Sequence, residues 1–193
     1  MATDILKLVH ILGVVFMSAP LYSLILVNER ALLGPSMVYS VDRYVENLIK
    51  KTAVRCYVFQ TTVLVTGIAL VYLYGMGLVS ILTDWVLAAK TGLLLMLMGL
   101  LSYVHFGIQP KVEALLAKVE GDPIPEEIAS AIRPLRIRRK KLAAICLFIV
   151  IFIIILGVQV SDRYGFGPTV VLVILAALFS WRVYRSPLRY GWI

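Results

Sequence analysis

Three side chains that can ionise lie inside long apolar stretches of this sequence: His10, Lys90 and His105. An ionisable group in a hydrocarbon environment costs free energy, so each of the three is a candidate for a functional role. The chain has no other histidine, and its two cysteines, Cys56 and Cys146, do not form a CxxC pair. The cysteines therefore indicate neither a disulfide framework nor a thiolate metal site.

The elements that must position these side chains are helices that cross a bilayer. The chain is 61% hydrophobic and only 16% charged, with a mean hydropathy of +0.92, whereas about a quarter of a soluble domain is charged. Five stretches have the roughly 20 apolar residues that a hydrocarbon core requires. They cover about 5–27, 54–74, 85–106, 142–160 and 168–184. We therefore predict an all-α integral membrane bundle of about five transmembrane helices, forming a single domain over residues 1–193.

The basic residues orient this bundle. They gather between the first and second spans and between the third and fourth, whereas the turn 75–84 has no Lys or Arg and the last turn has only Arg163. Because Lys and Arg accumulate in cytoplasmic loops, we expect the N-terminus outside and the C-terminus in the cytoplasm of a multi-pass protein of the cell inner (plasma) membrane. Anionic lipid attracts such loops, so the net charge of +8 indicates the lipid bilayer as the partner and not nucleic acid.

The two cytoplasmic segments, 35–52 and 110–141, have helical patterns of their own. The first follows a Gly-Pro-Ser start signal at 34–36, and we expect it either to lie on the inner surface or to extend the second span. In the second, the helix of the third span is expected to break at 121–123 and a new helix to start at Pro125. The run RIRRKK from Arg136 to Lys141 is expected to be a topology and lipid anchor for the fourth span.

This topology sets the depth of the ionisable side chains. His10 and Lys90 each lie about 8 Å below the outer surface, on two helices that run inward, so they can face one another. His105 lies about 22 Å deeper than Lys90 on the same helix. The two axial nitrogens of one iron must be about 4 Å apart, so His10 and His105 cannot share a haem. We expect His105 to belong to a polar network near the inner surface, with Ser102 and Tyr103.

A histidine and a lysine at one depth suit a haem b. A neutral imidazole binds iron, and an ammonium offsets a propionate that would otherwise be an unpaired anion. Gly13, one turn below His10, is expected to leave room for the flat macrocycle. The polar shell is expected to be completed by three residues of similar depth: Gln159, Tyr72 and Tyr74. The structural alternatives are that His10 is a hydrogen-bonded polar tip and that Lys90 extends to the outer surface.

Four short motifs spread over most of the chain form a familiar pattern. They are the opening KLVHILGVV at 7–15, the Arg55-Cys56-Tyr57 start of a Thr-rich second span, the series Trp85, Lys90, Tyr103 and His105, and Arg138-Arg139 before an Ile-rich fourth span. Together they resemble the HemJ-type protoporphyrinogen IX oxidases and the related copper-resistance-D-like families. These are small helical membrane proteins.

The resemblance implies a haem b ligated by the histidine of the first span, His10, with the third-span lysine, Lys90, as the catalytic residue at the same site. The implied activity is the six-electron oxidation of protoporphyrinogen IX to protoporphyrin IX, with the electrons passed to the respiratory chain. The Trp and the Pro-Arg pair usual in the first span of the family are replaced here by Phe16-Met17 and Ser23-Leu24. We therefore expect a b-type haem protein that acts in electron transfer or in porphyrinogen oxidation.

Two alternatives from other classes stay open. The first is a non-catalytic accessory subunit of a larger, respiratory-type membrane complex, in which the inner helices and basic loops contact other subunits or a second copy of the chain. The second is a copper-handling membrane protein. Copper transport favours Met, His and Cys clusters along one pore, and the methionines of this chain are scattered. The sequence therefore favours copper least.

Overall fold

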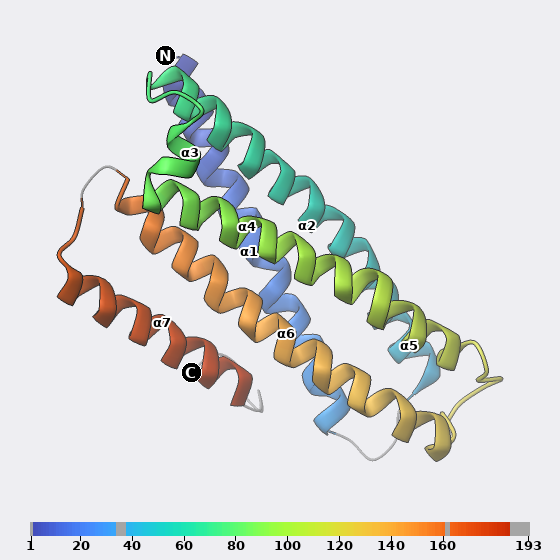
Figure 1. Ribbon diagram of the computed structural model, residues 1–193. Helices are drawn as coiled ribbons and strands as arrows, with labels where there is room; N and C mark the ends of the chain where they lie inside the picture. The colour runs from blue at the N-terminus through green and yellow to red at the C-terminus, as the bar shows by residue number, and fades with distance from the viewer. Residues whose placement is uncertain (1, 34–37, 161–162, 186–193) are drawn as a thin grey trace.

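The computed structural model describes residues 2–33, 38–160 and 163–185, with the backbone alone for residues 2, 20 and 22–33. All regular secondary structure in these ranges is helical (Figure 1). The elements are α1 (Ala2–Leu33), α2 (Tyr39–Leu73), α3 (Ser80–Thr83), α4 (Trp85–Ser102), the π-helical η1 (Tyr103–Ile108), α5 (Gln109–Leu116), α6 (Glu126–Val158) and α7 (Phe166–Arg185).

Four of these helical stretches are long and apolar enough to cross a membrane: α2, the continuous run from α4 through α5, α6 and α7. The described residues therefore form a helical bundle with four candidate membrane-spanning helices. The expected first span is α1, which is 32 residues long. The count of five spans and the orientation of the termini stay predictions.

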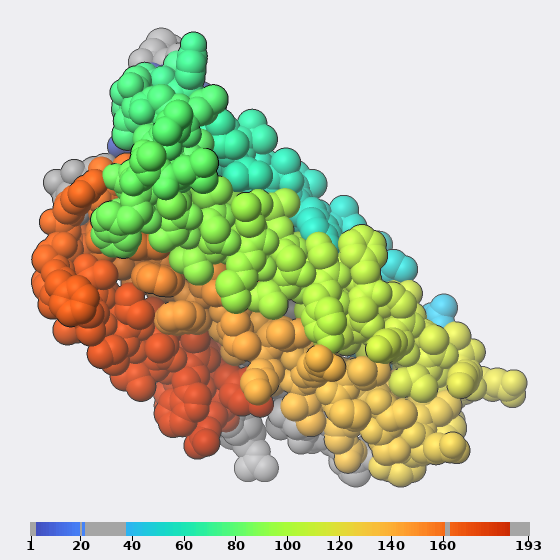
Figure 2. Space-filling model, viewed as in Figure 1, coloured from blue at the N-terminus to red at the C-terminus, as the bar shows by residue number. Residues whose placement is uncertain are grey.

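Helix α6 is the central element of the bundle. Helix α1 packs along both α2 and α6, while α4 and α7 each pack on α6. Figure 2 shows α7 and α4 on opposite sides of α6. Apolar side chains from four helices, among them Met17, Val63, Leu97 and Ile153, are buried together in the main core. This core joins α1, α2, α4 and α6 around the level of the ionisable side chains.

The two segments expected to be cytoplasmic are built largely as the sequence predicts. Helix α2 is continuous from Tyr39, so the first segment extends the second span; the start signal at 34–36 lies outside the described residues. The chain breaks after α5 and resumes at Glu126, directly after Pro125, as expected. Helix α6 then continues through Pro134 to Val158 without interruption.

A tight turn fixes the start of α4. Gly75 and Gly77 have φ angles of 70° and 73°, a conformation that glycine adopts without steric cost. Asp84 caps α4 by accepting hydrogen bonds from the backbone N–H groups of Val86 and Leu87 at 2.9 and 3.2 Å. Arg163 also binds the Asp84 carboxylate, at 2.7 Å. The turn therefore ties the first turns of α4, which carry Lys90, to the segment between α6 and α7.

The two ends of the bundle differ in chemistry. At one end lie the start of α1, the short helix α3 and the start of α4 (Figure 1); we call this the His10 end. At the other lie the start of α2, α5 and the start of α6 (Figure 1); we call this the Glu46 end. These names carry no assumption about which side of the membrane each end faces.

Candidate functional site

The His10 imidazole is held by a hydroxyl on α2. Its Nδ1 atom lies 2.9 Å from Thr66 Oγ1, and the Thr66 hydroxyl donates its own hydrogen to the Thr62 carbonyl at 2.6 Å. Because that hydrogen is already used, Thr66 Oγ1 accepts from His10 Nδ1–H. This arrangement favours the tautomer with the proton on Nδ1 and the lone pair on Nε2. A histidine that binds a metal is usually fixed in this way through its other nitrogen.

A glycine on α2 makes room for the imidazole ring. A Cβ atom added at Gly67 would lie 3.3 Å from His10 Cε1, closer than most side-chain contacts, so the ring rests directly against the α2 backbone. Sequence reasoning missed Thr66 and Gly67. The signal was the Thr-rich composition of the second span, but helix rotation decides which threonine faces α1.

Lys90 lies at the same end of the bundle, against α6. A Cβ atom added at Gly157 would be 3.5 Å from Lys90 Nζ. Lys90 lies near the start of α4 and His10 near the start of α1, and both helices begin at this end of the bundle (Figure 1). The side chain is only partly exposed. Among the described residues, no carboxylate forms an ion pair with Lys90. A cation without a counter-ion at this depth is costly.

Gly13 has a different role from the one expected. A Cβ atom added at this position would lie only 2.9 Å from Val63 Cγ2, so the glycine marks the closest approach of α1 to α2. The space in which we expected a macrocycle is filled by the Val63 side chain. Gly13 is thus explained by helix packing, in which small residues let two backbones come close.

The expected polar shell is present only in part. Gln159 is 2% exposed, and its Nε2 donates to Thr169 Oγ1 at 3.2 Å. Tyr72 and Tyr74 are 70% and 54% exposed, so they point away from the bundle. Gln159 is therefore the one member of the expected shell that turns inward.

His105 lies in η1 among aromatic rings. Its ring centroid is 6.0 Å from that of Tyr57 and 4.8 Å from that of Phe106. The structure does not show the polar network expected for His105: Ser102 Oγ accepts a hydrogen bond from the Tyr57 hydroxyl at 2.9 Å instead. His105 Nδ1 itself is buried and has no hydrogen-bond partner within the described ranges.

The two histidines occupy different levels of the bundle. His10 contacts Thr66 and His105 contacts Tyr57, and these two α2 residues are about 13 Å apart along the helix. This separation confirms that the two imidazoles cannot ligate one metal ion.

A second polar centre, which the sequence did not predict, lies at the opposite end. We call it the Glu46 cluster; its members are Asp42, Glu46, Gln109, Arg136 and Arg139. Arg139 binds both carboxylate oxygens of Glu46, at 2.6 and 2.9 Å. Arg136 donates to Asp42 at 2.8 Å and to Glu46 at 3.0 Å. Gln109 donates to Glu46 at 3.1 Å and accepts from Arg139 at 2.8 Å.

The expectation that the RIRRKK run is a topology and lipid anchor is wrong for its three buried residues, which are Lys140, at 5% exposure, and two arginines. Arg136 is 3% exposed and Arg139 is 0% exposed, so both guanidinium groups point into the bundle. Their spacing of three residues puts them on one face of α6, just as Asp42 and Glu46 share one face of α2. The sequence shows each spacing, but it does not show that the two faces meet.

The charges in this cluster stabilise each other. Glu46 precedes the apolar part of α2, outside the expected span. Burial favours its neutral form, but the hydrogen bonds and charges of Arg139 and Arg136 outweigh burial and hold the pKa of Glu46 below its ordinary value. Both carboxylates and both guanidinium groups are paired. The Glu46 cluster therefore connects α2, α5 and α6 and stabilises their packing.

The described residues contain no group of three or more His, Cys, Asp or Glu side chains that could hold a metal ion by themselves. The chain matches no protein-family model, no curated protein and no solved structure. The functional argument therefore rests on the two polar centres and their geometry.

Proposed function

We propose that this chain belongs with the HemJ-type haem proteins, binds a haem b through His10, and acts in membrane electron transfer or porphyrinogen oxidation. The observation that carries the proposal is the Lys90 ammonium, which has no carboxylate partner in the described chain. His10 and Lys90 both lie near the start of helices that begin at the same end of the bundle, and the Nδ1 atom of His10 contacts Thr66, so Nε2 is the atom that we propose as the metal ligand. The site needs a ligand that brings both a metal and an anion.

Simpler ligands satisfy only half of this requirement. A phosphate or a fatty-acid carboxylate would pair with Lys90 but would leave His10 Nε2 unused. A bare divalent cation would bind Nε2, but the Lys90 charge would repel it and the described residues offer no further cluster of ligands. A haem has an iron for the imidazole and propionates for the ammonium, so its donor requirements fit the residues present.

The residues of this chain have distinct roles in the proposed site. When bound, the haem supplies one-electron redox chemistry, and the protein tunes it. His10 Nε2 would hold the iron, and the Thr66 hydroxyl, 2.9 Å from Nδ1, would hold the imidazole ring in its orientation. Lys90 supplies the positive charge that pairs with a propionate, and it is the residue we propose as catalytic in porphyrinogen oxidation.

The side chains packed around His10 leave no open space for a porphyrin in this conformation. Val63 fills the side of α1 next to Gly13, and Gly67 contacts the imidazole. Two cavities of about 30 and 290 Å³ lie elsewhere, and neither is lined by His10 or Lys90. A porphyrin therefore enters only if the helices around His10 move apart, which makes haem binding a conformational event as well as a ligation.

The test is an absorption spectrum of protein purified after haem-supplemented expression, with and without dithionite. We expect a Soret band that sharpens and shifts on reduction, and we expect His10→Ala to abolish it. His105→Ala is the matched control and should keep the spectrum. A colourless protein, or a spectrum that His10→Ala leaves unchanged, would defeat the proposal and favour the accessory-subunit alternative. Protoporphyrin IX fluorescence, measured after adding protoporphyrinogen IX and a quinone as electron acceptor to the haem-loaded protein, separates oxidase activity from electron transfer alone.

A further inference from the structure

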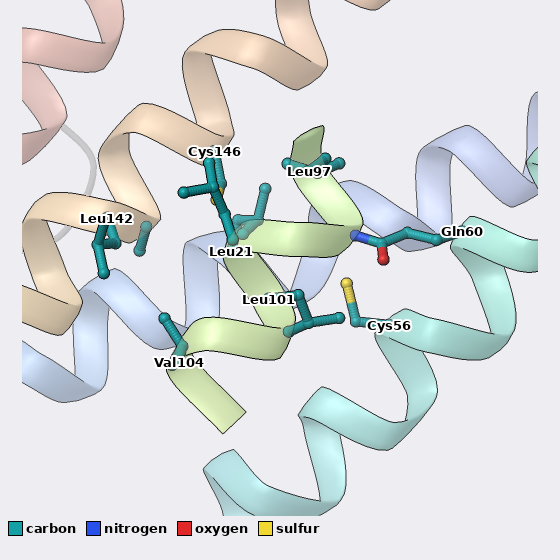
Figure 3. Close-up of a pocket in the computed structure, with 10 residues that line it drawn as sticks. Leu21, Cys56, Gln60, Leu97, Leu101, Val104, Leu142 and Cys146 are labelled. Carbon is teal, nitrogen blue, oxygen red and sulfur yellow. The ribbon is translucent and has the colours of Figure 1, made fainter. Parts of the chain in front are cut away.

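The cavities of about 30 and 290 Å³ differ in the chemistry of their walls. The smaller one lies inside the bundle, and apolar side chains such as Leu21, Leu97 and Leu101 form most of its wall (Figure 3). The larger one lies at the Glu46 end, between α2 and the end of α5. We call it the α2–α5 groove; the polar part of its wall consists of Arg43, Glu46, Asn47, Lys50 and Glu113. A polar ligand therefore finds charged partners in the groove.

One face of α2 supplies hydrogen-bond donors to the groove. Arg43, Asn47 and Lys50 are four and three residues apart, so they project from the same side of the helix. All three residues are exposed. The guanidinium and ammonium groups can only donate, and the amide adds an N–H₂ donor. Such a set matches an anion with several acceptor oxygens, of which a phosphate group is the usual example.

Arg43 is held in position without a carboxylate. Its Nη1 atom donates to the Tyr39 hydroxyl at 2.6 Å, and the guanidinium carbon lies 5.6 Å from the centroid of the Tyr39 ring. No carboxylate of the described ranges forms an ion pair with Arg43. The other N–H groups of this guanidinium are therefore available to a ligand, and their planar geometry suits two oxygens of one phosphate.

The two carboxylates of the wall do not cancel its cations. Both oxygens of Glu46 accept hydrogen bonds from Arg139, so this charge is already neutralised. Glu113 lies 3.2 Å from Lys50, but the two side chains are 39% and 53% exposed. An ion pair this exposed contributes little, so a phosphate that binds Arg43 can also take Lys50 from Glu113.

The groove lies at the level of lipid headgroups. Lys50 precedes the expected second span, which starts at about residue 54, by four residues, or about 6 Å along the helix. The headgroup layer on each side of a bilayer is roughly 5–8 Å thick. The same end of the bundle carries the Lys- and Arg-rich segments, and basic pockets beside membrane helices bind phospholipid headgroups.

We propose that the α2–α5 groove is a binding site for a phosphate group, supplied by the headgroup of an anionic phospholipid. Arg43 and Lys50 bind the phosphate oxygens, and Asn47, between them on the same face, donates a further hydrogen bond. The groove and the His10 site are at opposite ends of the bundle, so this site does not depend on the haem proposal.

Native mass spectrometry of the full chain in a neutral detergent, titrated with phosphatidylglycerol, tests the proposal. We expect Arg43→Gln and Lys50→Gln each to weaken binding of the first lipid about 10-fold, the effect of losing one hydrogen bond to a charged group. Lys51→Gln is the matched control, because it makes the same charge change at the adjacent exposed residue, which does not line the groove. Equal losses in Lys50→Gln and Lys51→Gln would show that binding follows net charge alone and would overturn the proposal.

Replacing the competing carboxylate should have the opposite effect. Glu113→Gln releases Lys50, so we expect tighter binding of phosphatidylglycerol. Glu120→Gln removes the same charge from an exposed residue outside the groove wall and should change the affinity less. Equal gains in the two variants would contradict the site.

A soluble probe identifies the source of the phosphate. Glycerol 1-phosphate has the same chemical group without acyl chains, and we expect it to leave phosphatidylglycerol bound at millimolar concentration, because the lipid also contacts the apolar surface of the bundle. Displacement that Arg43→Gln weakens would keep the phosphate site but assign it to a free phosphate ester. Binding of neither probe would overturn the proposal.

Discussion

The hydroxyl of Thr66 does two things at once for His10. By donating to the Thr62 carbonyl at 2.6 Å, it becomes a pure acceptor toward the imidazole, 2.9 Å away. This sets the tautomer and limits rotation of the ring. The residue that prepares the ligand is therefore on a different helix from the ligand, and nothing in the spacing of α1 alone points to it.

The first prediction follows from this contact. Thr66→Val keeps the shape of the side chain but removes the oxygen, so we expect haem affinity to fall about 10- to 100-fold, the usual effect of losing a hydrogen bond that orients a metal ligand. Thr62→Val is the control, because the Thr62 hydroxyl binds only the Val58 carbonyl of its own helix. Haem titration monitored at the Soret band measures both. Equal loss in the two variants would mean that the His10 contact has no special role.

Lys90 acts through charge, so its replacement should give a graded effect. Lys90→Met removes the cation, and we expect weaker haem retention and a lower midpoint potential, because a nearby positive charge favours the reduced iron. Lys90→Arg should preserve more of both properties, since it keeps the charge. A redox titration of the purified variants measures the potential. If Lys90→Met and Lys90→Arg behave alike, the effect is steric and the proposed propionate pairing fails.

At the scale of single elements, the sequence predicts the long helices, but it does not predict which faces of these helices pack against each other. The membrane-spanning parts of α2, α6 and α7 follow from apolar runs, and the start of α6 follows from Pro125 and two acidic residues, all visible in the sequence. Which faces of two helices meet depends on rotations that one sequence does not fix. For this reason Arg136 and Arg139 looked like lipid anchors, although their partners lie about 90 residues away.

The ion pairs of the Glu46 cluster should control the stability of the α2–α6 contact. Glu46→Gln keeps the shape but leaves Arg139 buried without its charge partner, so we expect a loss of about 3–5 kcal/mol in the free energy of unfolding. Glu113→Gln is the control: its pair with Lys50 is half exposed, and its loss should cost at most about 1 kcal/mol. Thermal unfolding in detergent measures the stability of both variants. Equal losses in the two variants would contradict a stabilising role for the Glu46 cluster.

The same cluster predicts a direction for the dependence of stability on pH. The pKa of Glu46 is below its ordinary value of 4.5, so its contribution is fully present above that value and is lost as the pH falls through the lower, folded-state pKa. Glu46→Gln should reduce this acid sensitivity, which the melting temperature measured across the same pH range would show. A variant as acid-sensitive as the unmodified chain would assign the effect to other carboxylates.

At the scale of the whole molecule, the two polar centres lie at opposite ends of one bundle, with a packed apolar core between them. The sequence placed His10 and Lys90 at one end of the bundle, as the structure does, because both residues lie near the start of helices that run in the same direction; their pairing stays a prediction. It did not predict the Glu46 cluster, since this cluster forms where three helices, α2, α5 and α6, meet. The sequence thus predicts depth along a helix better than contacts around it.

Topology is the prediction that connects these centres to the two sides of the membrane. The Glu46 end carries the Lys- and Arg-rich segments, whereas the turn 75–84 at the His10 end has no Lys or Arg, so the positive-inside rule places the Glu46 cluster at the cytoplasmic face and the His10 site near the outer face. An epitope tag inserted at 77–79, beside the exposed Val79, should be reached by antibody from outside intact spheroplasts. A reporter fused after Ile193 should be active only in the cytoplasm. A tag at 77–79 that is protected until the membrane is opened would invert the bundle: it would leave the His10–Lys90 geometry intact but place any electron transfer on the cytoplasmic side.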